Sequence, residues 1–272
     1  MNMNPKGIRM NPLESKVLAW SQLSKQRIIR TGELSKVLGI NPQQEEKLLI
    51  KMNKSGIIIR LNKGLYLLPG TLPTAPWSAS EYFLLSILME ETGAQYQVTG
   101  LAAFRFHKLS TQIPNQITVY NTKISGLRKI GIVNFYFIKV SSDRIGAYRE
   151  IEVKDFSSTR AVNISSLART IVDAVYDYKR FATLPDAYDW IRERANDETF
   201  LKELVELTLK FANITTCRRI GYFLESIKVN PKLVNKIYKT LEETSAFIPM
   251  LPGLVNRGKI NRRWGVKING TI

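Results

Sequence analysis

Residues 31–68 constrain the fold more than any other stretch, because two short helical patterns are followed there by a hairpin pattern. Thr31 is placed to cap the first helix and Gly39 to end it. Its apolar residues follow at i, i+3 and i+4 spacing: Leu34, Val37 and Leu38. This spacing predicts a helix with one apolar face.

A second helix is predicted to begin directly after that glycine. Asn41 is its cap, Pro42 occupies the first turn, and Gln44 follows three residues after the cap, as in a capping box. One face of this helix is apolar, with Leu48, Leu49 and Met52. Another face is polar and basic, with Gln44, Lys47, Lys51 and Lys54 at spacings of 3, 4 and 3.

A hairpin pattern completes the stretch after Gly56. A β-branched run from Ile57 to Leu61 precedes the turn Asn62-Lys63-Gly64, and the apolar residues 65–68 form the returning strand. Helix, tight turn, helix and basic-tipped hairpin is the order of a winged helix-turn-helix, whose second helix enters the major groove of DNA. The alternative is a small helical unit with a solvated lysine face. DNA binding is favoured because the helix caps, the tight turn, the polar and basic helix face and the basic hairpin tip all agree with it.

The interface is predicted from these positions. We expect helix 42–55 to lie in the major groove and the hairpin tip to contact the DNA backbone. The residues nearest bases or phosphates on the helix are Gln43, Gln44, Lys47 and Lys51. The backbone contacts are expected from Lys54, Arg60, Asn62 and Lys63.

The charge of the chain supports a polyanionic partner. The net charge is +17 over 272 residues. Residues 1–70 hold 12 basic and 4 acidic side chains, a net +8, and residues 71–272 hold 28 and 19, a net +9. A positive field of this size attracts nucleic acid and makes binding dependent on salt, so double-stranded DNA is the expected partner.

The rest of the chain predicts an α+β protein of two domains, 1–70 and 71–272, joined by a linker rich in proline and glycine at 69–76. A first helix starts at Asn11, and Ile28-Ile29 forms a strand that pairs with the wing. The second domain is expected to begin with helices after Ser80 and Thr99. Three strands follow between residues 116 and 154. We then expect helices at about 165–175, 184–195, 198–212, 216–228 and 231–243, and a last strand at 264–268 that closes onto the earlier sheet.

Two further basic stretches have two interpretations. Residues 92–142 and 245–272 contain no acidic residue. Their lysines and arginines either form a second anionic contact, to DNA or to an acidic protein, or are separate solvated side chains. The basic residues of the first stretch are Arg105, Lys108, Lys123, Arg128, Lys129 and Lys139; those of the second are Arg257, Lys259, Arg262, Arg263 and Lys267.

Little in the sequence indicates catalysis. A single histidine, His107, and a single cysteine, Cys217, exclude multi-histidine metal sites and internal disulfides, so we predict no enzyme, metal or cofactor. Both residues are expected to be structural. A weak alternative is the PD-(D/E)xK nuclease pattern, with Asp143 and then Glu152-Val153-Lys154 on a strand, in which carboxylates would hold Mg²⁺.

The location expected from the sequence is the cytoplasm, with no membrane contact. The longest apolar stretch, around residues 83–89, is too short to span a bilayer. Residues 1–12 carry Lys6 and Arg9 without the apolar core of a signal peptide.

Three segments resemble the AbiEi family of antitoxins from type IV toxin–antitoxin systems. The wing, residues 60–66, is similar to the family's pattern of a basic residue, three others, glycine, one other and tyrosine. Residues 164–173 resemble its segment in which Arg-Thr-x-x-Asp, here Arg169 to Asp173, opens a helix. Residues 261–269 resemble its closing strand.

The resemblance implies a transcriptional autorepressor that binds inverted repeats upstream of its operon, as a monomer in solution that binds cooperatively on DNA. It also implies that residues 71–272 counteract a co-encoded AbiEii-like toxin of nucleotidyltransferase fold, in phage defence, without a stable complex being required. A stand-alone winged-helix regulator is the alternative, because the residues themselves support only DNA binding.

Overall fold

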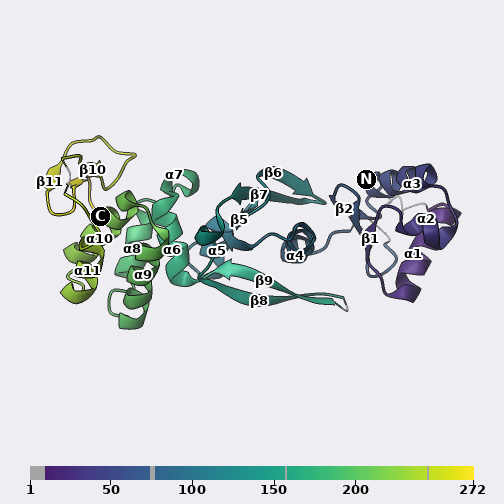
Figure 1. The fold of residues 1–272 in the computed structure, drawn as a ribbon, viewed down its shortest axis with the longest axis horizontal. Coiled ribbons are helices and arrows are strands. Elements are labelled where there is room, and N and C mark those ends of the chain that lie inside the picture. The colour runs from purple at the N-terminus through teal and green to yellow at the C-terminus, as the bar shows by residue number, and fades with distance from the viewer. Residues whose placement is uncertain (1–9, 74–76, 157, 244) are drawn as a thin grey trace, which may run out of the picture. The chain divides into compact units, whose positions relative to one another are not determined.

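A computed structural model describes residues 10–73, 77–156, 158–243 and 245–272 as an α+β protein (Figure 1). Its described residues divide into two compact units. Unit 1 takes in the described residues of Met1–Gln95, Lys123–Phe137 and Glu150–Val162, and unit 2 those of Tyr96–Thr122, Ile138–Arg149 and Asn163–Ile272. Lys6, Arg9 and the Pro76 of the predicted linker lie outside the described residues. The predicted domains 1–70 and 71–272 stay a prediction.

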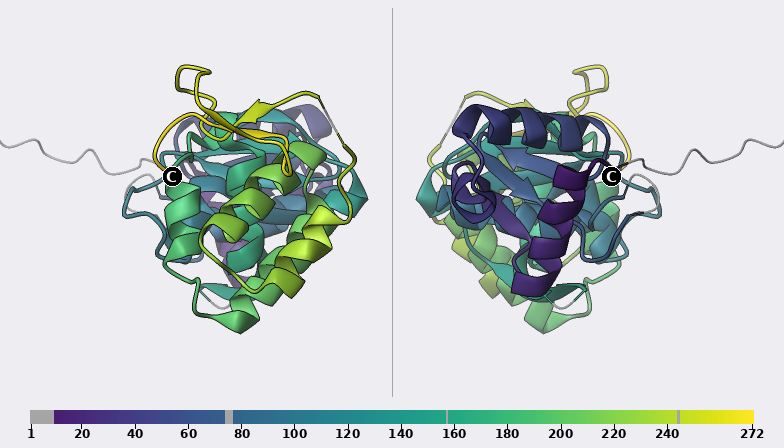
Figure 2. Two further views of the ribbon diagram at one scale, coloured as in Figure 1. Left: turned by 90° about the vertical axis from the view of Figure 1, so that its left-hand side faces the viewer. Right: turned by 90° about the vertical axis from the view of Figure 1, so that its right-hand side faces the viewer.

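Unit 1 begins with a module of three helices and three short strands, seen in purple and blue in the right-hand view of Figure 2. Its elements are α1 (Pro12–Ser24), β1 (Ile28–Arg30), α2 (Glu33–Leu38), α3 (Pro42–Lys54), β2 (Ile59–Asn62) and β3 (Leu65–Leu67). The strands form an antiparallel sheet in the order β1-β3-β2. The expected pairing of Ile28 and Ile29 with the hairpin is confirmed, against Leu67 and Tyr66.

Local capping explains where two of these helices begin. The Asn11 side chain accepts from the Glu14 backbone N–H and the Glu14 carboxylate accepts from that of Asn11, and Asn41 and Gln44 repeat the arrangement at α3. Both capping boxes are confirmed. The cap predicted for α2 is wrong, since Gly32 is its N-cap and Thr31 caps nothing.

The apolar faces of these elements meet in one core. Its fully or nearly fully buried members include Val17, Leu18, Ile29, Leu34, Leu49, Met52, Ile57, Ile58 and Leu68. At about 25 cal/mol per Å² of apolar surface removed from water, burying each of these side chains contributes about 1.5–3 kcal/mol. Val37, expected on the buried face, is 45% exposed, because a helix as short as α2 turns only part of its surface toward the core.

The central sheet has more strands than the sequence predicts. Six strands lie in the order β6-β7-β5-β4-β9-β8. The pairs β6–β7 and β4–β5 are antiparallel, and the pair β4–β9 is parallel. Their bounds are β4 (Tyr96–Thr99), β5 (Ile117–Asn121), β6 (Gly126–Ile130), β7 (Val133–Lys139), β8 (Tyr148–Asp155) and β9 (Ser158–Ser165). The last three contribute residues to both units. Strands β4, β6 and β9 were not predicted, since β4 and β9 run directly into helices and the polar β6 lacks an alternating apolar pattern.

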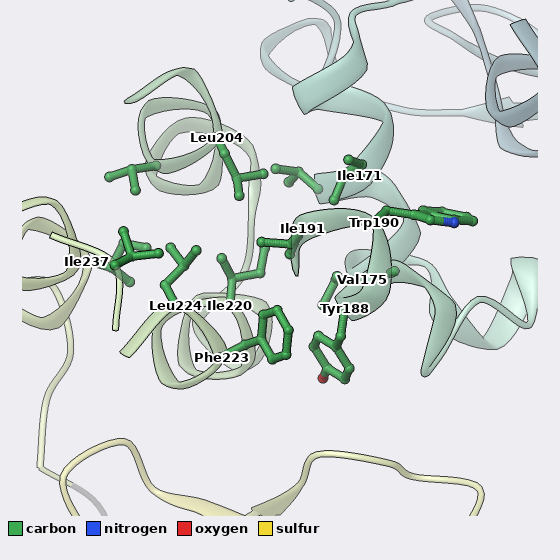
Figure 3. Close-up of a cluster of buried hydrophobic side chains, with 14 of the residues drawn as sticks. Ile171, Val175, Tyr188, Trp190, Ile191, Leu204, Ile220, Phe223, Leu224 and Ile237 are labelled. Carbon is green, nitrogen blue, oxygen red and sulfur yellow. The ribbon is translucent and has the colours of Figure 1, made fainter. Parts of the chain in front are cut away.

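Helices dominate the remainder of the chain. They are α4 (Glu81–Thr92) in unit 1 and, in unit 2, α5 (Gly100–Phe106), α6 (Leu167–Tyr176), α7 (Tyr178–Phe181), α8 (Asp186–Arg192), α9 (Glu198–Phe211), α10 (Ile214–Ser226) and α11 (Pro231–Tyr238). The predicted helices are confirmed to within about three residues at each end, except that α11 ends at Tyr238 and not at about 243. Ser166 caps α6 through a bond from the Arg169 N–H. A buried cluster joins α6, α8, α9, α10 and α11 (Figure 3), with Ile171, Val175, Ile191, Leu204, Ile220, Leu224 and Ile237 among its residues.

The closing strand lies in a separate small sheet. β12 (Val266–Ile268) pairs in parallel with β10 (Ile248–Pro249) and antiparallel with β11 (Lys259–Asn261). The prediction that it closes onto the earlier sheet is therefore wrong. Residues 248–261 supply local pairing partners, and buried Trp264 anchors the sheet on α10, where a β-carbon added at Gly221 would lie 2.1 Å from the ring.

Candidate nucleic-acid interface

The two faces of α3 differ in burial as the sequence predicts. Leu48, Leu49 and Met52 are 5% exposed or less. The side chains of the other face are exposed to solvent: Gln43, Gln44, Lys47, Lys51 and Lys54. A helix with this division is amphipathic, and its exposed face presents amide and ammonium groups to solvent.

Glu45 fixes the turn between α2 and α3. Its side chain is fully buried, and its carboxylate accepts from the backbone N–H groups of Gly32 (2.9 Å) and Leu34 (3.1 Å) and from the Ser35 hydroxyl. The carboxylate thus satisfies two of the backbone N–H groups at the start of α2, which is the kind of role predicted for Thr31. No local signal could have revealed this, because the carboxylate and the N–H groups belong to different helices.

Lys51 has a partner that the sequence did not indicate. Its Nζ lies 3.0 Å from the Glu14 carboxylate, which is only 1% exposed, whereas the Lys51 side chain is 62% exposed. The ion pair connects α1 to α3. The positive charge of Lys51 is therefore partly neutralised by Glu14. Lys47 and Lys54 have no ion-pair partner among the described residues.

The hairpin is hydrogen-bonded to α3 and to the turn that precedes α2. The Arg60 backbone N–H donates to Asn53 Oδ1 on α3 at 2.9 Å, and the Thr31 N–H donates to the Gly64 carbonyl at 2.9 Å. The pairing register shifts between Arg60 and Asn62, which marks a bulge. Arg60 and Lys63 are exposed, and Asn62 is half-buried with its carbonyl accepting from Arg60 Nε at 3.3 Å.

A cavity of about 490 Å³ lies beside the hairpin within unit 1. Three cationic side chains line it: Lys54 of α3, Arg60 of β2 and Lys129 of β6. The described residues around it include no carboxylate, and the half-buried Trp77 forms part of the wall. The sequence places Lys129 in the basic stretch 92–142, so a position beside the end of α3 was not predicted for it.

The basic residues of 92–142 do not all belong to one unit. Lys123, Arg128 and Lys129 belong to unit 1, whereas Arg105, Lys108 and Lys139 belong to unit 2. In the C-terminal stretch, Arg263 pairs with Glu225 at 3.3 Å and lies over the Tyr238 ring.

The residues of the nuclease pattern lie on two elements, a short turn and β8. Asp143 lies in a short 3-10 turn (Ser142–Arg144), exposed to solvent, and a hydrogen bond from Ser141 lowers the pKa of its carboxyl group. Glu152 and Lys154 are exposed on β8. Across the described parts of the chain, no three histidine, cysteine, aspartate or glutamate side chains are grouped to hold a metal ion.

The single histidine and cysteine are packed side chains. His107 Nε2 donates to the Ser165 carbonyl at 2.7 Å, and burial lowers the pKa of the imidazole. Cys217 is 6% exposed, and burial raises the pKa of its thiol to about 11 in spite of the neighbouring arginines. A thiol held protonated in this way is a poor nucleophile.

Comparison with known proteins shows a similarity of fold to a solved structure and no match in sequence. No family model matches the chain, and no curated protein matches it. A crystal structure of the Rv2827c protein from Mycobacterium tuberculosis is similar over 96% of this chain and 94% of that one, with a TM-score of 0.63 and 12% sequence identity. At this identity the likeness extends to the fold alone. In the described ranges, no helix has the length and apolar character needed to cross a membrane.

Proposed function

We propose that the N-terminal module is a winged helix-turn-helix that binds double-stranded DNA, with α3 in the major groove and the β2–β3 hairpin as the wing. The observation that carries this proposal is the division of α3, whose apolar face is buried and whose opposite face presents Gln43, Gln44 and Lys47 to solvent. The element order, with the sheet β1-β3-β2 behind two consecutive helices, supports it.

Each side chain has a role in the proposal. Gln43 and Gln44 have amides that can pair with adenine edges, and Lys47 reaches guanine or phosphate. Lys54, Arg60 and Lys63 contact phosphates, which position the module without reading sequence. Asn62 acts mainly through its carbonyl, which orients Arg60, and Lys51 contributes less because it also pairs with Glu14.

The biological role we propose is that of a cytoplasmic autorepressor and antitoxin of the AbiEi type, acting on an inverted-repeat operator and counteracting a nucleotidyltransferase-fold toxin. The resemblance of residues 60–66, 164–173 and 261–269 to that family supports it. The contrasting hypothesis is a regulator that has no toxin. An open reading frame for a nucleotidyltransferase next to the gene favours the antitoxin.

The DNA half is tested by salt titration. The chain is titrated against its own upstream region and an unrelated duplex of equal length, and Arg60→Ala and Lys63→Ala are compared with the wild type. Each change is expected to weaken binding to both duplexes equally and to lower the slope of log K against log salt by about 1. The exposed Lys202, which pairs with Glu198 on α9, supplies the matched control Lys202→Ala. Slopes equal to the control for both variants would contradict the wing assignment.

The antitoxin half is tested by survival of cells that express the adjacent open reading frame. Co-expression of the full chain is expected to restore growth. The double variant Arg60→Ala/Lys63→Ala is expected to restore growth as well while losing repression of a reporter behind the upstream region. A harmless neighbour would remove the antitoxin role and leave the DNA-binding proposal standing.

A further inference from the structure

The tip of the β6–β7 hairpin is packed against the edge of the wing. A β-carbon added at Gly131 would lie 3.5 Å from the Ile59 side chain, so the tip rests on β2. The Trp77 indole donates to the Ile57 carbonyl at 2.7 Å and closes the same corner. These contacts lie within unit 1 and hold β6 beside the residues with which α3 ends and β2 begins.

Three cations therefore face one cavity, two from the consecutive elements α3 and β2 and the third from β6, which is distant in sequence. Lys54, Arg60 and Lys129 are exposed, and none has an ion-pair partner among the described residues. Arg60 donates from Nε to the Asn62 carbonyl, which leaves its terminal nitrogens available. Like charges held around one space repel each other, and the repulsion is relieved when an anion binds between them.

The surroundings indicate what kind of anion the cavity accepts. Its volume, about 490 Å³, is larger than a free phosphate needs. Ile132 at the hairpin tip also lines it and is 75% exposed, and Leu127 on the same hairpin is 72% exposed. Cations beside exposed aliphatic side chains suit a phosphate that carries its sugar. A guanidinium with two free nitrogens can bind such a phosphate in a bidentate manner.

We propose that this cavity binds a backbone phosphate of duplex DNA through Lys54, Arg60 and Lys129, and that the β6–β7 hairpin is thereby a third DNA-contacting element beside α3 and the wing. The inference rests on the proposed function, since it adds a contact to the same interface. Its distinctive claim is that Lys129, 66 residues after Lys63 in the sequence, contacts the same duplex. An acidic protein is the competing occupant.

The test compares full-length wild type with Lys129→Ala, Lys129→Arg and Lys202→Ala on an unrelated duplex of about 30 base pairs, because phosphate contacts are independent of sequence. Lys202→Ala removes the same charge from an exposed lysine of α9. Binding is measured from about 50 to about 300 mM KCl. Lys129→Ala is expected to lower the salt slope by about 1 and the affinity roughly five-fold. Lys129→Arg is expected to bind as the wild type does.

Ethylation interference identifies the phosphate itself. The wild-type pattern is expected to contain one position that Lys129→Ala loses and Lys202→Ala keeps. Equal slopes and equal interference patterns for Lys129→Ala and Lys202→Ala would overturn the inference and leave the proposed DNA binding intact, with an acidic protein as the next candidate for the cavity. A wild type that binds no duplex would overturn the inference and the proposed function together.

Discussion

Arg169 and Asp173 lie one turn apart on α6 and form an ion pair with both side chains fully buried. Arg169 Nε lies 2.9 and 3.0 Å from the two carboxylate oxygens. The other guanidinium nitrogens donate to the carbonyls of Gly146 (3.3 Å) and Arg144 (2.8 Å). Burial raises the pKa of Asp173 and the neighbouring guanidinium groups of Arg169 and Arg144 oppose that shift. In this structure the Arg-Thr-x-x-Asp segment connects α6 to the turn at 144–146, so it holds unit 2 together.

Replacing Arg169 by methionine is expected to destabilise the protein by about 3–5 kcal/mol, because the buried Asp173 would lose its main counter-charge. Urea unfolding followed by circular dichroism measures the change. Arg192→Ala is the control, since its pair with Asp189 is exposed and its loss should change the free energy of unfolding by about 0.5 kcal/mol or less. Equal effects of the two substitutions would contradict a structural role for the Arg169–Asp173 pair.

Gln44 combines a structural and a proposed recognition role, which two substitutions separate. Gln44→Ala removes the side-chain half of the capping box with Asn41 and the amide donor together. Gln44→Glu keeps an oxygen acceptor for the Asn41 N–H, replaces the amide donor and adds a negative charge. Both are expected to change the preferred sequence in a selection from random duplexes, with a loss of about 0.5 kcal/mol in stability for alanine alone.

The same selection carried out with Lys63→Ala supplies the comparison for Gln44. That variant should bind all sequences more weakly without a change in preference, because it removes a proposed phosphate contact. If the Gln44 variants also leave the preference unchanged, the placement of α3 in the major groove is wrong.

Lys51 and Lys47 lie on the same exposed face of α3, but their replacement is expected to change the stability of the protein by different amounts. Lys51→Ala leaves the buried Glu14 carboxylate without its cation and should cost about 1–2 kcal/mol. Lys47→Ala, which breaks no ion pair among the described residues, should change stability by about 0.5 kcal/mol or less. Thermal unfolding of the matched variants measures both. A loss for Lys51→Ala no larger than that for Lys47→Ala would show that the Glu14–Lys51 pair contributes nothing measurable to stability.

His107 is expected to make stability depend on pH in mildly acidic solution. Burial lowers the pKa of the folded-state imidazole below 6.5, so the unfolded chain binds more protons. The contribution is present above the unfolded pKa and is lost as the pH falls through 6.5 toward the folded pKa. The urea concentration at the midpoint of unfolding should therefore decrease as the pH is lowered from about 7 to about 5.5, a range in which most carboxylates stay ionised.

His107→Gln is the control for this dependence. Glutamine can still donate to the Ser165 carbonyl but does not titrate, and no other histidine is present in the chain. The variant should show a flatter profile over the same pH range. Identical profiles for the variant and the wild type would assign the dependence to other groups.

Features that depend on neighbours along the chain could be predicted from the sequence. The caps at Asn11 and Asn41 and the amphipathic face of α3 follow from spacings of three and four residues, which a helix converts directly into contacts. The hairpin at 59–67 follows in the same way from its turn residues. These elements also place most of the candidate interface residues on the surface.

Tertiary structure alone decided which distant residues meet. Glu45 and not Thr31 accepts from the N–H groups at the start of α2, Glu14 pairs with Lys51, and Lys129 lines the same cavity as Lys54. The closing strand likewise pairs with residues 248–261 and not with the central sheet. Each of these contacts joins elements that local spacing treats independently, and their geometry is set by how whole helices and strands pack their apolar faces. The sequence by itself therefore determined the elements and their exposed charges, and packing determined which of those charges are paired and which have no ion-pair partner among the described residues.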